Sequence, residues 1–181
     1  MLLNSDVAKN WTIQVYNGGT LEGTIPISKM VNDSIRIKEQ LCSSDALKIG
    51  SCEAASLEIQ LADIGDLELK DKRLEIIVSM QGSEYFEFSL GSFRVDENPR
   101  RNNTWFYTLT AYDNMTLFDT DVRKWYSRLA FPVTLKQLRD SLCAYVGVQQ
   151  AAGQTLPLDN LRLTKADLAG SLSGREALRA I

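Results

Sequence analysis

The chain has 181 residues, a formal net charge of −3 and a hydrophobic content of 44%. This composition is typical of a folded globular protein, and the length suits one domain or slightly more. Histidine is absent from the sequence, which excludes Ser-His-Asp and Cys-His catalysis and histidine-ligated zinc.

Short runs of alternating apolar and polar residues fill the first two-thirds of the chain. They lie at residues 35–41, 57–61, 74–80, 86–95 and 105–109. A period of two predicts strands with one buried and one solvated face, which is typical of antiparallel sheet. Asn17-Gly18-Gly19 predicts the turn of a first hairpin, and Gly91 within a run predicts a bulge or a barrel corner. The sequence therefore predicts a small antiparallel β-barrel over residues 1–130.

Helical signals replace the alternation after residue 113. Residues 134–137 have the spacing of a capping box, and apolar residues at helical spacing follow until Gly147. Residues 173–176 form a second capping box, which opens a helix of only about two turns before the sequence stops. These signals predict the start of a helical second domain over residues 131–181, truncated in this chain. The expected fold class is mainly β, α+β overall.

The sequence shows no pattern of a catalytic, metal or cofactor site. The cysteines are three in number and form no CxxC pair, so we interpret them as reduced, mostly buried thiols. Asp113, Asp119 and Asp121 cluster near a turn, where turn-forming and capping roles explain them better than a bound cation. Glycine-rich phosphate loops and a nucleophile elbow are absent from the sequence. We therefore expect a protein that is not an enzyme and uses no cofactor.

Two groups of residues are candidates for a protein interface. Arg123, Trp125 and Tyr126 belong to residue types that are enriched at interface hot spots, although Trp125 fits equally well as a core residue that plugs the barrel end. Arg100 and Arg101 lie in a polar connection between two strand runs and are candidate anchors for a neighbouring subunit. Arginines near aromatic residues also fit an oligonucleotide-binding barrel, which the net negative charge disfavours.

The sequence carries no sign of a membrane or export segment. Its apolar runs are all shorter than the roughly 18 residues that span a bilayer, and its first seven residues lack the basic start of a signal peptide. We therefore expect a protein that is made in the cytoplasm and has no membrane partner.

Five segments, in order along the chain, resemble tail proteins of phages and prophages of Gram-positive bacteria. Residues 39–56 resemble the opening region of these proteins, and residues 88–95 resemble their G-x-F/Y-x-V strand. Residues 110–115 are similar to their A-Y-D-x-M strand end, residues 131–140 to their P-x-T-L-K helix start, and residues 172–175 to their L-S-G helix start. The ordered set, more than any one motif, carries the resemblance over about residues 30–181.

The resemblance implies a baseplate or tail-tip hub protein, in which a small antiparallel barrel precedes a partly helical domain. Hubs of this kind assemble as rings, usually threefold, that join the tail tube to the tip and form part of the channel for DNA exit. For this chain it implies a virion structural protein that self-associates as a trimeric ring in its full-length form and contacts other tail-tube and baseplate proteins. It implies no specific nucleic-acid partner. The net charge of −5 over residues 1–133 suits a channel that does not retain DNA.

Two other functions stay open from the sequence. The first is an oligonucleotide-binding β-barrel module, which salt-dependent binding of single-stranded DNA would support. The second and more remote one is a tail-associated cell-wall hydrolase fragment, although no residue of this chain matches a hydrolase region.

Overall fold

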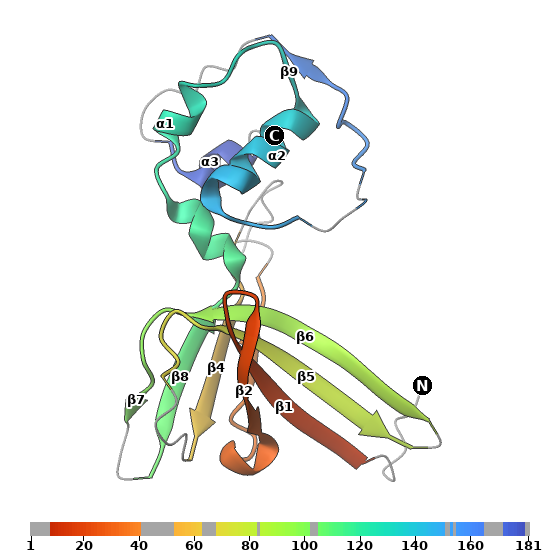
Figure 1. Cartoon of the computed structure of the whole chain (residues 1–181), viewed down its shortest axis with the longest axis vertical. Helices are drawn as coiled ribbons and strands as arrows, with labels where there is room; N and C mark the ends of the chain where they lie inside the picture. Colours follow the sequence, from red (N-terminus) through yellow and green to blue (C-terminus); the bar gives the residue numbers. More distant parts are fainter. Residues whose placement is uncertain are drawn as a thin grey trace. The chain divides into compact units, whose positions relative to one another are not determined.

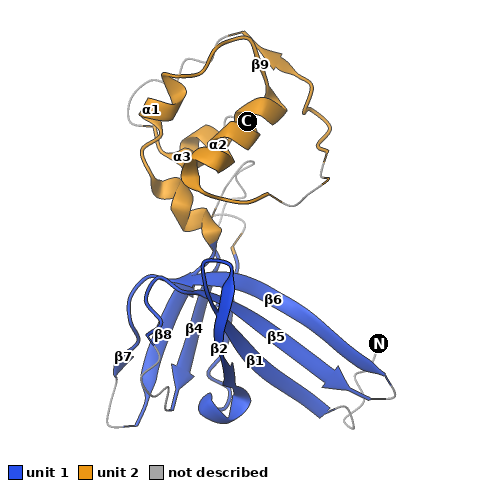
Figure 2. Ribbon diagram, in the orientation of Figure 1, with its two compact units in different colours: residues 1–39, 55–113 blue, residues 40–54, 114–181 orange. Residues whose placement is uncertain are grey.

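The computed structural model of the chain describes residues 8–40, 53–62, 68–82, 84–101, 105–150, 153, 155–164 and 172–179. These residues are mainly β, with one large antiparallel sheet and three short α-helices (Figure 1). The chain divides into two compact units (Figure 2). The first unit comprises residues 1–39 and 55–113, and the second comprises residues 40–54 and 114–181. Residues 40–54 and 114–130, which the sequence analysis assigned to the first domain, thus cluster with the second unit.

The first unit is built on an antiparallel sheet in the strand order β2-β1-β5-β6-β8-β4-β3, with β7 paired to β8. Five strands overlap the five alternating runs, which confirms that the period of two marks antiparallel strands. The β1–β2 hairpin turns at Gly18 and Gly19, as predicted. The bounds are β1 (Ala8–Asn17), β2 (Thr20–Pro26), β3 (Arg36–Lys38), β4 (Ser56–Leu61), β5 (Arg73–Gln81), β6 (Tyr85–Val95), β7 (Arg100–Arg101) and β8 (Tyr107–Tyr112).

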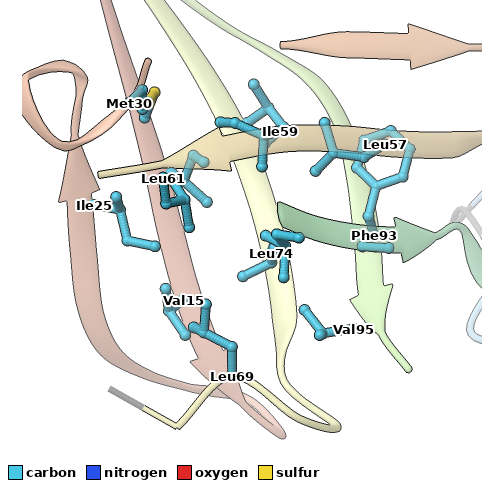
Figure 3. Close-up of a cluster of buried hydrophobic side chains, with 14 residues drawn as sticks. Val15, Ile25, Met30, Leu57, Ile59, Leu61, Leu69, Leu74, Phe93 and Val95 are labelled. Carbon is cyan, nitrogen blue, oxygen red and sulfur yellow. The ribbon is translucent and has the colours of Figure 1, made fainter. Parts of the chain in front are cut away.

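The core of this unit gathers apolar side chains from one face of almost every strand (Figure 3). Its members alternate along each strand, as the pleat requires. Burying this many branched side chains contributes about 1.5–3 kcal/mol for each one, relative to leaving it exposed. The buried residues are Ile13, Val15, Ile25, Met30, Leu57, Ile59, Leu61, Leu69, Leu74, Ile76, Phe93, Val95, Leu109 and Ala111.

A short crossover connects the two ends of the sheet. After β2, the 3₁₀ helix η1 (Ile27–Lys29) leads into a bridge between Met30 and Leu61 at the end of β4. The Val31 N–H donates to the Gln60 carbonyl at 2.9 Å, and the chain then continues into β3. Within the described residues no hydrogen-bonded ladder joins β2 to β3, so the predicted antiparallel sheet is present without a closed barrel.

A bulge divides β6 into two parts with different surroundings. The register of β5 with β6 shifts between Ile76 and Ile77, opposite Gly91, whose φ of +147° is a conformation that side-chain-bearing residues rarely adopt. The bulge at Gly91 confirms the sequence prediction. Phe93 and Val95 after the bulge are buried in the core, whereas the residues before it are mostly exposed.

The second unit is a small helical cluster with one short two-stranded sheet. Its elements are η2 (Asn114–Asp119), α1 (Arg123–Tyr126), β9 (Val133–Thr134), α2 (Leu135–Val146), β10 (Arg162–Leu163) and α3 (Gly174–Arg179). Its core contains Phe118, Val122, Trp125, Leu138, Leu142, Cys143, Leu172 and Ala177.

Both predicted capping boxes are confirmed. Thr134 Oγ1 accepts from the Gln137 N–H at 3.1 Å, while Gln137 Oε1 accepts from the Thr134 N–H at 3.0 Å. At α3, Glu176 Oε2 accepts from the Ser173 N–H at 2.8 Å, and Ser173 Oγ accepts from the Glu176 N–H at 3.2 Å. Gly147 ends α2 in the left-handed conformation, with a φ of +84°.

Candidate protein interface

Arg100 and Arg101, the first pair of candidate anchors, lie on the two-residue strand β7 and are exposed. Arg100 forms an ion pair with Glu97, and the Arg101 guanidinium lies 5.9 Å from the centre of the Tyr107 ring. Arg100 also lines an open groove of about 380 Å³, to which Asp96 and Glu97 contribute carboxylates. The local charge is therefore mixed, which weakens this site as a phosphate-binding surface.

Arg123, Trp125 and Tyr126, the second candidate group, lie on α1 of the second unit. Trp125 is only 6% exposed, and its indole N–H donates to Ser141 Oγ at 3.2 Å. Its ring belongs to the core of the second unit and not to the core of the sheet, so Trp125 is a core residue but is not seen to plug a barrel end. Tyr126 packs edge-on against Phe131 at a centroid distance of 6.1 Å.

Arg123 is held by its neighbour Asp121. The Arg123 N–H donates to Asp121 Oδ1 at 2.9 Å, and its Nε donates to Asp121 Oδ2 at 2.8 Å. These hydrogen bonds lower the pKa of Asp121 and raise the pKa of Arg123. Asp121 therefore serves α1 locally, in the way the sequence analysis interpreted the aspartates of this region.

A more prominent surface lies where β1, β5 and β6 extend past the rest of the sheet (Figure 1). We call this three-stranded extension the wing and define it by residues 8–11, 77–81 and 85–90. In the register of the strands, Trp11, Val78 and Phe88 form one row across the wing. This row lies on the same face as the buried residues Ile13 and Ile76, because the positions differ by two.

Apolar residues on the core face of the sheet continue along the wing, where several of them are exposed to solvent. A second row places Met80 between Lys9 and Phe86. Phe86 is 56% exposed and Phe88 is 42% exposed, while Tyr85 on the opposite face is also exposed. Contiguous exposed apolar side chains on a soluble domain mark an interaction surface.

The edge of the wing along β6 is open. Among the described residues, residues 85–93 pair with β5 only, because β8 meets β6 only at Arg94 and Val95. Glu87 lies on the polar face and accepts a hydrogen bond from the Tyr85 hydroxyl at 2.6 Å, which raises the pKa of Tyr85. An edge with unpaired backbone groups is a template for another strand.

A cleft with a mixed lining lies next to the wing at the crossover between β2 and β3. It has a volume of about 370 Å³, and its apolar lining includes Trp11, Ile27, Met30, Val31 and Ile35. Trp11 thus belongs both to the wing and to the cleft.

The part of the chain that the structure describes lacks two further kinds of feature. It contains no cluster of three or more Cys, Asp or Glu residues that could hold a metal ion, and no helix long and apolar enough to cross a bilayer. Cys42 and Cys52 lie outside the described residues; Cys143 is a free thiol whose burial raises its pKa. A search of protein-family models found no match to this chain, and a search of curated proteins found none either.

Proposed function

We propose that this chain is a structural component of a bacteriophage tail, in the part of the baseplate or tail-tip hub that joins tube to tip. The observation that supports this proposal most strongly is the wing, whose apolar face and open edge form an assembly surface. Phe86 and Phe88 would be costly to expose in a protein that works alone. In a structural protein that binds other copies of itself and neighbouring tail proteins, these two phenylalanines would be covered by the partner.

The ordered segments that resemble tail proteins lie at structurally defined places. Residues 88–95 cross the β6 bulge, and residues 110–115 run from the end of β8 into η2. Residues 131–140 contain the capping box and first turns of α2, and residues 172–175 begin α3. Most of residues 39–56 lie outside the described residues. Motifs that coincide with a bulge and two helix starts have a physical reason to recur at similar spacings.

We further propose that the sheet of the first unit acts as an incompletely closed hub barrel. The crossover at Met30 brings the chain from β2 to the end of β4, where Met30 and Leu61 form a bridge. Strands on both sides of the gap between β2 and β3 contribute side chains to one buried core. In an assembled ring, neighbouring copies would cover the remaining open edges.

Purified phage particles test the tail assignment. The expected result is that peptides of this chain co-purify with intact tails in a fixed ratio to the tube protein, and that disruption of the gene gives heads without functional tails. Particles that lack the chain, with infectivity unchanged by the disruption, would refute the assignment.

A further inference from the structure

We propose that the wing of one copy adds to the β3 edge of a second copy, so that the sheet continues from one chain to the next. This inference deepens the proposed function, on which it rests for its setting in a ring, and it names the partner of the wing. The occupant is a second copy of this chain, and the contact joins two different edges.

The donor edge on β6 has a defined pattern of faces. Phe86 and Phe88 lie on the apolar face, and Glu87 lies on the polar face between them. Glu84, which is exposed, adds a second negative charge beside the strand. The donor is therefore apolar on one side and acidic on the other.

The acceptor edge on β3 has the matching pattern. β3 pairs with β4 alone among the described residues, so its other edge is open. Arg36 and Lys38 are exposed, whereas Ile37 between them is half-buried against the core. β3 is therefore apolar on the inner side and carries two cations on the outer side, where Arg36 lies opposite Glu58 of β4 and Lys38 lies opposite Ser56.

Among the described residues, no other open strand edge of the first unit carries two cations on either side of an apolar residue, and the open end of β1 carries Lys9 alone. On β2, the only charged residue, Glu22, is paired with Lys72 at 2.7 Å. On β7, Arg100 is paired with Glu97. Charge thus favours β3 as the complement of the β6 edge, which carries Glu87 and is preceded by Glu84.

The residue spacing of the two strands allows apolar residues to pair on one face while opposite charges pair on the other. If Ile37 of one copy lies opposite Phe86 of the next in an antiparallel pair, Arg36 lies opposite Glu87. If Ile37 lies opposite Phe88, Lys38 takes that place instead. Either register puts apolar side chains together on one face and opposite charges together on the other, and both kinds of cross-strand pair are stabilising. The cleft lined by Ile35 and Asp33 lies directly before this edge.

Pairing of two β6 edges with each other is disfavoured. Such a contact would bring Glu84 and Glu87 of both copies together at one edge, without a cation on the wing strand before Arg94. A contact between two different edges is heterologous, and it closes into a ring when the rotation between copies permits.

Charge reversal followed by charge exchange tests the contact. Sedimentation of the whole chain over a wide concentration range measures its self-association constant. Glu87→Lys alone, and Arg36→Glu with Lys38→Glu, should each weaken the association by about tenfold. The chain that carries all three changes should regain most of the lost affinity. A β6–β6 contact predicts instead that the β3 changes have no effect.

Loss of the two phenylalanines gives an independent measurement. Phe86→Ser with Phe88→Ser should weaken the association by at least about tenfold, because aromatic side chains dominate interface energies. Leu21→Ser is the matched control, since Leu21 is 49% exposed on β2 of the same unit and lies outside the contact. Amide hydrogen exchange of residues 85–90 should slow as the wild-type concentration rises.

Three outcomes overturn the proposal: a wild-type chain that stays monomeric at millimolar concentration, charge exchange that fails to restore association, or a Leu21→Ser effect equal to that of the phenylalanines. The two proposals fail separately. Virions that contain the chain while the reversals leave its association unchanged would refute this contact and keep the tail assignment. Restoration by charge exchange in a chain absent from virions would keep the contact and refute the tail assignment.

Discussion

Replacement of Gly91 by alanine should destabilise the first unit by about 3 kcal/mol. An alanine Cβ at this position would lie 2.9 Å from Cε2 and 3.1 Å from Cζ of Phe93, whose ring is buried in the core. Overpacking of this kind costs about 1–3 kcal/mol. The φ of +147° adds a backbone cost of about 1–3 kcal/mol for any residue with a side chain. Both costs arise only in the folded state, so both lower the free energy of unfolding.

Hydrogen exchange in increasing urea measures this loss unit by unit. Peptides from β5 report on the first unit, and peptides from α2 in the same sample provide an internal reference, because two units need not unfold together. Gly23→Ala is the matched control, since no atom lies within 4 Å of the added Cβ and the strand conformation is ordinary. The β5 midpoint should fall for Gly91→Ala and stay nearly constant for Gly23→Ala. Equal urea midpoints of β5 exchange in the two variants would refute both the backbone strain at residue 91 and the clash with the Phe93 ring.

Three further predictions concern the second unit. Thr134→Ala removes half of the capping box and should cost about 1 kcal/mol, measured as faster amide exchange in the first turn of α2. Leu142→Ala empties a fully buried site and should cost about 3 kcal/mol in urea unfolding of α2. Asp159 is 3% exposed, and its hydrogen bond from Arg139 at 2.6 Å keeps the pKa of its carboxyl below the ordinary 3.8. This unit should therefore lose stability as the pH falls below about 4, and Asp159→Asn should remove that part of the pH dependence in urea midpoints.

Two of these predictions have a direct control. A Ser substitution at residue 134 should retain the cap, so an equal loss for serine and alanine would argue against the capping role. An undiminished acid dependence in Asp159→Asn would assign the titration to another carboxyl.

Local sequence patterns determine much of this fold. The strands follow from the period of two, because alternation is set by the pleat of each strand alone. The start of α2 follows from Thr134 and Gln137, because a capping box satisfies backbone groups within one turn. The bulge follows from Gly91, the residue type that tolerates the required φ. Such features need no knowledge of distant parts of the chain.

Features that depend on long-range pairing were less accessible to sequence analysis. Phe86 and Phe88 alternate like core residues, yet β6 extends past the strands that would cover them. The sequence signal for their exposure is length: the strands of the 74–95 hairpin are longer than β4 and β8, so part of the hairpin has no strand beside it. Trp125 is a residue type that is enriched at interface hot spots. It is nevertheless buried, and its indole N–H donates to Ser141 on α2. The open seam between β2 and β3 likewise depends on pairing that alternation alone does not specify.

The second unit is not a contiguous stretch of the chain, because residues 40–54 belong to it while interrupting the first unit. Glu53, at the end of this insertion, lies 3.9 Å from Arg175 and 3.8 Å from Arg179, both on α3. A gene fragment that stops after residue 113 would therefore encode this carboxylate without its two cations. Replacement of α3 alone would likewise leave Glu53 without these two cations, so the carboxylate and the helix have to be changed together.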